Sequence, residues 1–264
     1  MPQTLSSVRN AARLLSSFSA AEPELGVSEL ARRLGLAKSA VHRLLITLAG
    51  ERLVEQNPAT GRYRLGIRIY ELGAVVSSHL DLHDAVALYI DDLRNRTGET
   101  VHVAILDGAE VVYVERRESP RTLRAFGRIG HRNFAHCTST GKVLLASLPQ
   151  DELERLLASR ELVARTPYTI TDLGALLVEL ERVRRLGHAE NVNEGEVGLA
   201  SVAAPIRDAG GQVIAAISVA GPAVRLEGEV RRRFAAAVME TGAAISERLG
   251  YRPERHQPRS VRSA

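Results

Sequence analysis

The stretch "LARRLGLAKSAVHRLLITL" (residues 30–48) contains two short runs with apolar residues at helical spacing, separated by a single glycine. Leu30, Ala31 and Leu34 share one face of the first run, and Gly35 favours a helix end. The second run predicts a helix over about 38–50, with its apolar side buried: Val41, Leu44, Leu45 and Leu48. Two short helices joined by about three residues with a glycine form a helix-turn-helix.

In a helix-turn-helix, the second helix presents its N-terminal residues to base edges in the major groove. The apolar pattern leaves one face of this helix pointing outward. Ala37 stands where a capping Ser or Thr is expected, so this helix lacks a side-chain cap. Helical hairpins are also common in protein cores, and the motif alone leaves that alternative open. The outward residues, our candidate DNA-contacting residues, are Lys38, Ser39, Ala40, His42, Arg43 and Thr47.

The flanking sequence extends this motif into a winged helix. A helix is expected at about 4–18, and Ser28 is the expected N-cap of the helix that follows the "AAEPELG" break. The segment "RLVEQNPATGRYRLG" predicts a strand hairpin after the second helix of the motif. Alternation places Arg62 and Arg64 outward, where wing residues meet phosphates, while Tyr63 and Leu65 are expected to pack.

The positive charge of the chain is concentrated in this first quarter. Residues 1–68 hold ten Lys and Arg against five Asp and Glu, although the whole chain holds 35 against 31. Such a distribution suggests that only the N-terminal part binds a polyanion. The alternative is that these basic residues simply form a solvent-exposed face. Helix-turn-helix, basic wing and local charge together favour binding to double-stranded DNA.

Composition narrows the class of protein further. The apolar runs are far shorter than the ~20 residues of a membrane-spanning helix, so no membrane association is expected. The N-terminus lacks the apolar segment of a secretory signal, and a single cysteine, Cys137, agrees with a reducing compartment. We therefore expect a cytoplasmic protein.

The remaining residues predict a linker helix over 67–80 and a larger domain. Asp81 is expected to cap a second helix that ends at Gly98, with an apolar side formed by Ala85, Leu88, Ile90 and Leu93. A hairpin over residues 100–118 follows, turning at Asp107-Gly108, with alternating apolar residues on both strands. Grouped rather than alternating strands and helices indicate an α+β fold with an antiparallel sheet. Further helices are expected at about 139–147, 151–158, 172–186 and 227–249, and strands at about 188–193, 200–207 and 212–220. The predicted domains are 1–66 (winged helix-turn-helix), 67–80 (linker), 81–250 (α/β domain) and 251–264 (basic, disordered tail).

The segments that resemble catalytic or metal-binding motifs do not match the full patterns of those motifs. "HCTSTGKV" lacks the first glycine and the final Ser or Thr of a phosphate loop, and it lacks the leading glycine of a nucleophile elbow. His131, His136 and Cys137 have no second ligand pair, which favours a packing histidine and a buried thiol over a metal site. No metal or cofactor is expected. The helix start at 138–141 suits a carboxylate, although these residues alone favour an ordinary N-cap.

Four segments together resemble the isocitrate-lyase-regulator (IclR) family of bacterial transcriptional regulators: "LGLAKSAVHRLLITL", the wing end "YRLG", "HCTSTGKVLLASLP" and "APIRDAGGQVIAAISVAGP". The resemblance covers about residues 4–250. It implies a winged helix, a linker helix and a GAF-like effector-binding domain, assembled as homodimers or dimers of dimers on operator DNA. Asn191 stands where some members carry an acid, and Ala220 where some carry a serine. The effector-contacting positions implied by the resemblance are Ser139, Thr140, Asn191, Ser201, Ser218 and Ala220.

The function expected is a DNA-binding regulator of a metabolic operon that senses a small organic acid or related metabolite, and not an enzyme. A hydrolase or transferase with a winged-helix appendage is one alternative. It needs a nucleophile–base pair or a metal set, and the large domain shows neither. A winged helix used for protein interaction is the other. Salt-sensitive binding to a palindromic site separates these alternatives, because counterion release gives DNA binding a steep salt dependence.

Overall fold

A computed structural model describes residues 5–19, 21–78, 82–125, 128–158 and 161–252. The chain divides into two compact units, Met1–Leu80 and Asp81–Ala264. Asp81, the expected helix cap, and residues 253–264 of the expected tail lie outside the described residues. The finer division at residues 66, 80 and 250 stays a prediction.

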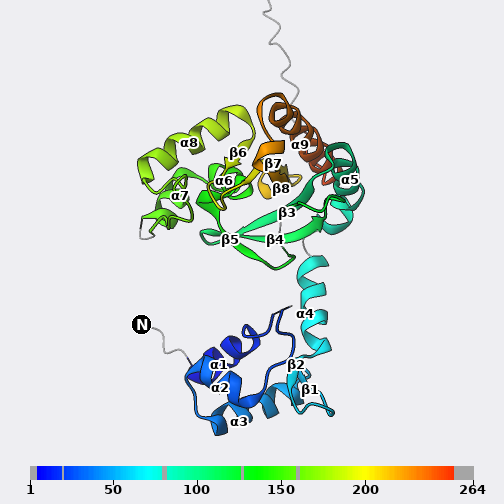
Figure 1. Cartoon of the computed structure of the whole chain (residues 1–264), viewed down its shortest axis with the longest axis vertical. Helices are drawn as coiled ribbons and strands as arrows, with labels where there is room; N and C mark the ends of the chain where they lie inside the picture. The colour runs from blue at the N-terminus through cyan, green and yellow to red at the C-terminus, as the bar shows by residue number, and fades with distance from the viewer. Residues whose placement is uncertain (1–4, 20, 79–81, 126–127, 159–160, 253–264) are drawn as a thin grey trace, which may run out of the picture. The chain divides into compact units, whose positions relative to one another are not determined.

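The N-terminal unit contains a helix-turn-helix followed by a two-stranded wing (Figure 1). Its core is formed mainly by leucines of the three helices, together with Val54 and Tyr63 of the wing. Tyr63 also exchanges two backbone hydrogen bonds of 2.9 Å with Leu25, which tie the wing to the segment before the second helix. The elements are α1 (Ser6–Leu15), α2 (Val27–Leu34), α3 (Lys38–Gly50), β1 (Val54–Gln56), β2 (Tyr63–Leu65) and α4 (Ile67–Ser78).

Three details of this unit correct the sequence predictions. The N-cap position of α2 is Gly26, with no side-chain cap, so the expected cap at Ser28 is wrong because α2 begins at Val27, two residues earlier than a cap at Ser28 requires. Leu65 was expected to pack into the core of this unit, but its side chain is 39% exposed. Leu65 is the last residue of β2 and lies at the edge of the core, opposite the buried Val54 of β1. The first helix is shorter than expected.

The C-terminal unit is built on one antiparallel sheet of six strands in the order β5-β4-β3-β8-β7-β6. Chain neighbours pair in β3–β4 and β7–β8, and the central β3–β8 pair joins the two halves of the domain. The strands are β3 (Thr100–Asp107), β4 (Glu110–Arg117), β5 (Arg132–Phe134), β6 (Ala189–Val192), β7 (Leu199–Arg207) and β8 (Val213–Pro222).

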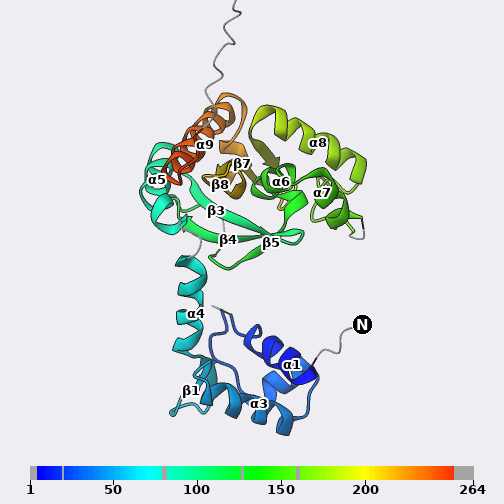
Figure 2. The same ribbon diagram turned by 180° about the vertical axis from the view of Figure 1, so that it is seen from behind.

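Helices cover both faces of this sheet (Figures 1 and 2). On one face, α5 (Leu82–Thr97) and α9 (Gly228–Arg248) pack together and against the strands. On the other, α6 (Ser139–Ala146) lies directly on the sheet, and α8 (Leu173–Leu186) packs against α6. Leucines of α7 (Gln150–Leu157) belong to the same core. The expected α+β fold with an antiparallel sheet is confirmed.

The short strand β5 and the 3-10 turn Ala135–Cys137 that follows it were not expected. These two elements lead directly into α6 and so determine where that helix begins. Two smaller predictions are wrong. The β3–β4 turn is Gly108-Ala109, since Asp107 pairs with Glu110, and Leu88 on the expected apolar face of α5 is 74% exposed. Within the described part of the chain, no helix is both long and apolar enough to cross a membrane.

Candidate functional site

Helix α3 carries the candidate DNA-contacting face. Its buried side packs against α2, and the predicted outward residues are exposed, apart from the half-buried Ala40. Thr47 Oγ1 donates a hydrogen bond of 3.0 Å to the Arg43 carbonyl, so that hydroxyl is partly occupied. Four outward side chains make no hydrogen bond or ion pair with any residue that the structure describes, which leaves their donors free for base edges. They are Lys38, Ser39, His42 and Arg43.

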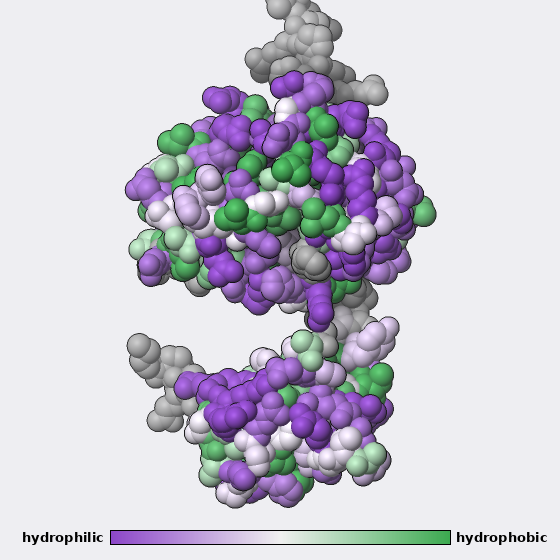
Figure 3. All heavy atoms as spheres, viewed as in Figure 1, coloured by the Kyte–Doolittle hydropathy of each residue, from purple (hydrophilic) through white to green (hydrophobic). Residues whose placement is uncertain are grey.

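The two arginines of the wing are exposed, as predicted, but each already has a carboxylate partner. Arg62 Nη2 lies 3.0 Å from Glu29 Oε2 and 2.9 Å from the Glu24 carbonyl oxygen. Arg64 Nε donates to Glu55 Oε1. A guanidinium has five N–H donors, so each arginine retains donors for a phosphate. Figure 3 shows hydrophilic side chains over most of the visible face of this unit.

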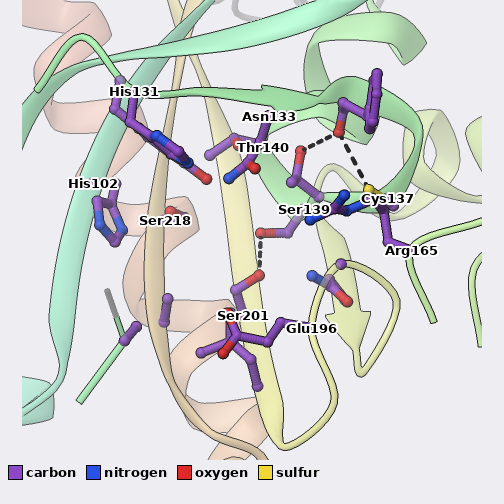
Figure 4. Close-up of a pocket in the computed structure, with 18 of the residues that line it drawn as sticks. His102, His131, Asn133, Cys137, Ser139, Thr140, Arg165, Glu196, Ser201 and Ser218 are labelled. Atoms are coloured by element: carbon purple, nitrogen blue, oxygen red, sulfur yellow. Dashed lines mark hydrogen bonds between the residues drawn. The ribbon is translucent and has the colours of Figure 1, made fainter. Parts of the chain in front are cut away.

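The C-terminal unit contains a cavity of about 540 Å³ between the start of α6 and the sheet (Figure 4). All six of the effector-contacting positions implied by the resemblance line it. The register explains why the sheet residues meet. Ser201 pairs with Asn191 on one side and with Ala220 on the other, so their side chains share one face.

The start of α6 forms the opposite wall. Thr138 caps the helix by accepting a hydrogen bond of 3.1 Å from the Gly141 amide. Gly141 is required, because a Cβ there would lie 2.1 Å from the Ala135 carbonyl oxygen of the preceding turn. This tight packing presents Ser139 and Thr140, both buried, to the cavity. The sequence favoured an ordinary N-cap; the structure has that cap at Thr138 and, beside it, two cavity-lining residues.

The donors at this helix start are available. Among the described residues, the backbone N–H groups of Ser139 and Thr140 have no acceptor. The Ser139 and Ser201 hydroxyl oxygens lie 2.7 Å apart, and the two side chains point toward each other in Figure 4. Asn191 accepts a hydrogen bond of 3.0 Å from the Glu194 amide through Oδ1, which turns its side-chain NH2 toward other acceptors. The wall therefore offers several uncharged donors to one small group.

Charge is confined to the rim of the cavity. Arg128, His131, Arg165 and Glu196 line the cavity and are exposed, so the two arginines outnumber the one carboxylate. The buried lining residues that the structure describes carry no charge at neutral pH, since burial lowers the pKa of His102 to about 3, aided by the nearby Arg116 and His131. An anion is thus attracted at the rim and bound by neutral donors inside.

Sequence reasoning missed several lining residues. His102 had a signal, because it is the one polar residue within "VHVAIL", a strand with otherwise apolar side chains. Tyr113 on the adjacent strand had none, since an aromatic residue in a strand is ordinary core. The rim residues Arg128, Arg165 and Glu196 come from loops whose course only the tertiary structure determines.

The geometry gives no support to enzyme chemistry. Burial raises the pKa of Cys137 to about 11, which keeps the thiol protonated and unreactive. The partner of the Ser139 hydroxyl is another serine rather than a base. His136 is buried, with Nε2 donating to the Val163 carbonyl at 3.1 Å, as a packing histidine. In the described part of the chain, no three His, Cys, Asp or Glu residues cluster as metal ligands would.

Comparison with known proteins identifies both units. Residues 7–58 match the IclR helix-turn-helix domain, and residues 74–247 match the C-terminal domain of the bacterial transcriptional regulator IclR. The HTH-type transcriptional regulator XynR of Escherichia coli K12 is 36% identical over 247 residues, which cover 94% of this chain and 98% of that protein. These relatives are transcriptional regulators and not enzymes.

Solved structures agree with the fold. The Thermotoga maritima IclR is 30% identical, with a TM-score of 0.76 over 94% of this chain and all of the other. An IclR homologue from Microbacterium hydrocarbonoxydans, solved in complex with 4-hydroxybenzoate, is 26% identical, with a TM-score of 0.83 over 92% of this chain and 99% of the other. With its helix-turn-helix unit and its cavity-bearing α+β unit, the chain belongs to the IclR family of bacterial transcriptional regulators.

Proposed function

We propose that this protein regulates a metabolic operon in the cytoplasm by binding operator DNA in response to a small organic acid. The observation that carries the proposal is the concentration of buried, uncharged donors around one helix start in the 540 Å³ cavity. A cavity of this size suits a small metabolite, because ligand pockets typically measure about 300–1,000 Å³.

The carboxylate of the effector would bind at the start of α6. The free N–H groups of Ser139 and Thr140 point out of the helix N-terminus, where the helix dipole favours negative charge. The Ser139 and Ser201 hydroxyls bond to each other, which leaves one hydroxyl hydrogen free as a further donor, and Asn191, in place of an acid, removes a source of repulsion. Ser218 and Ala220, on the neighbouring strand β8, line the same cavity. The relative crystallised with 4-hydroxybenzoate binds a molecule of this class.

The DNA-binding surface would combine α3 and the wing. The free side chains of Lys38, Ser39, His42 and Arg43 would read base edges, with Ala40 and Thr47 on the same face, while Arg62 and Arg64 would contact phosphates. Effector binding would change operator affinity by favouring one arrangement of the DNA-binding units over another.

The regulator would act as a homodimer or a dimer of dimers. Helix α4 exposes Ile67 (54%), Tyr70 (75%) and Leu72 (47%), which point to more than one side of the helix. Exposed apolar residues of this kind mark interaction surfaces, and two-fold operators require paired DNA-binding units. Analytical ultracentrifugation of the wild type and of Tyr70→Glu tests this: the variant should shift toward the monomer.

The test of the effector proposal uses the full-length protein. Small carboxylic acids are screened by thermal shift, since a ligand at ~100 times its Kd adds about 2.7 kcal/mol of stability. Acids that stabilise the protein are then added to gel shifts with the intergenic DNA beside its gene. A stabilising acid that changes operator affinity supports the proposal, whereas stabilisation only by uncharged or cationic compounds contradicts it.

A further inference from the structure

His102 is a polar residue buried in the wall of the cavity. It lies on β3 between Val101 and Val103, which are completely buried, and is itself only 3% exposed. Its ring packs against that of Tyr113, with centroids 4.7 Å apart. Its Nε2 has no hydrogen-bond partner among the residues that the structure describes. A buried polar atom without a partner is costly, so such an atom beside a cavity indicates a missing partner.

Ser218 repeats this situation on the neighbouring strand. It is 2% exposed, lines the same cavity, and its hydroxyl makes no hydrogen bond within the described part of the chain. In the β3–β8 register it is the direct partner of His102, which places the two side chains on one face with Cβ atoms about 5 Å apart. Figure 4 shows them next to each other on the same side of the pocket. One ligand oxygen could therefore contact both groups.

The charge state of this pair decides what it binds. Burial and the nearby Arg116 lower the pKa of His102, so the imidazole is neutral at physiological pH. A neutral imidazole has one donor nitrogen and one acceptor nitrogen, and a serine hydroxyl both donates and accepts. Neither group brings positive charge or the field of a helix N-terminus. The pair thus suits an uncharged oxygen, while the carboxylate is better served at Ser139 and Ser201.

We propose that His102, together with Ser218, is a specificity-determining residue that selects effectors carrying a hydroxyl or carbonyl oxygen in addition to their carboxylate. The preferred class is then a small hydroxy acid or keto acid. This inference rests on the proposed function, because it assumes that an organic acid occupies the cavity. It goes further by assigning the second polar group of the ligand to a residue outside the positions implied by the family resemblance.

The experiment compares matched acids that differ in one oxygen. Lactate and pyruvate are each compared with propionate, and 4-hydroxybenzoate with benzoate, by calorimetric titration of the full-length protein. We expect the wild type to prefer the oxygenated acid in at least one pair by about tenfold or more, which corresponds to about 1.4 kcal/mol. A binding site that leaves polar groups unpaired with the plain acid discriminates in this direction.

Two variants at position 102 locate the preference. His102→Leu should reduce it below about threefold by weakening only the oxygenated acid, because the plain acid makes no contact with the ring nitrogens. His102→Gln, which keeps a donor and an acceptor, should retain part of it. His188→Leu is the matched control, since this histidine does not line the cavity. Ser218→Ala gives the same comparison if His102→Leu does not fold, and it too should reduce the preference.

The outcomes separate this inference from the proposed function. Equal binding of the oxygenated and plain acids by the wild type overturns the inference and leaves the carboxylate site intact. A preference for the oxygenated acid that survives in His102→Leu also overturns the inference. So does an equal loss of affinity for the oxygenated and the plain acid, because that result places the carboxylate at His102. If no acid binds at all, the proposed function fails and the inference falls with it.

Discussion

The hydroxyl oxygens of Ser139 and Ser201 lie 2.7 Å apart, although 62 positions separate the two residues in the sequence. This contact closes the cavity wall between the start of α6 and strand β7. It also places two hydroxyls where the backbone N–H groups of α6 are unpaired. The site for an anion is therefore made where a helix meets a sheet, and it depends on the tight packing of Gly141 on the preceding turn.

A bulky side chain at position 139, at the start of α6, should abolish the response to the effector. In Ser139→Phe, the ring occupies the space in front of the free N–H groups, so the acid found by screening should no longer shift operator binding. Operator affinity without effector, measured by fluorescence anisotropy, should stay within about threefold of wild type, because the N-terminal unit is untouched. Ser147→Phe, outside the lining of this cavity, is the control. A fully responsive Ser139→Phe variant would remove this cavity from consideration.

The exposed face of α3 should determine sequence specificity. Lys38→Ala and Arg43→Ala each remove a side chain with no partner in the described chain, so the folded protein loses no internal contact. Loss of a base contact should cost about 1–3 kcal/mol and relax the preference at one base pair. Competition binding with single-base operator variants measures both effects. Unchanged affinity in both variants would contradict the assignment of α3 as the recognition helix.

The wing arginines should affect all DNA sequences alike. Arg62→Ala and Arg64→Ala should each flatten the slope of log K against log salt by about one unit, since each removes one phosphate contact. The slope is measured between low and moderate salt on operator and on random DNA. Because Arg62 also pairs with Glu29, a Glu29→Gln variant shows how much of its effect comes from that ion pair. A sequence-selective loss would place the wing in a groove.

Removal of the buried ammonium of Lys142 should destabilise the C-terminal unit. Its Nζ lies 2.8 Å from Glu194 Oε1 and 3.1 Å from Glu179 Oε1. Lys142→Ala leaves Glu194 as an unpaired buried carboxylate, whose pKa burial already raises, while Glu179 retains Arg182. We expect a loss of about 3 kcal/mol in urea unfolding. Adding Glu194→Gln should recover part of it. A loss that the second substitution leaves unchanged would mean that the effect is one of packing alone.

His102 should make the protein less stable in acid. Its pKa is about 3 in the folded state, far below the ordinary value of 6.5, so below pH 6.5 the unfolded chain takes up a proton that the folded chain does not. The contribution of His102 to the free energy of unfolding is therefore fully present above pH 6.5, and it is lost toward pH 3 by about 1.4 kcal/mol per pH unit. Urea unfolding at pH 7 and pH 5 should show a loss about 2 kcal/mol larger for wild type than for His102→Gln. Equal losses would show that His102 is protonated in the folded protein.

The sequence by itself determined the local elements and the organisation of the chain. Periodicity and the glycine at position 35 placed the helix-turn-helix, because a left-handed turn (φ 68°) ends α2 there. Alternation placed β3, β4, β7 and β8 close to their observed bounds. These features depend on residues near each other in the chain, which is why pattern reasoning predicts them. The resemblance to a family supplied the six effector positions, which local patterns did not.

Only the tertiary structure decided which polar groups meet. The β3–β8 pairing joins residues more than 100 positions apart, so no local pattern could place His102 opposite Ser218. Arg62 has a carboxylate partner in Glu29 because the wing packs beside the segment that leads into α2 and beside the start of that helix. The charged residues at the rim of the cavity lie on loops, and the course of these loops depends on how side chains pack in the tertiary structure. Long-range register and packing, rather than composition, thus decide which donors surround the effector.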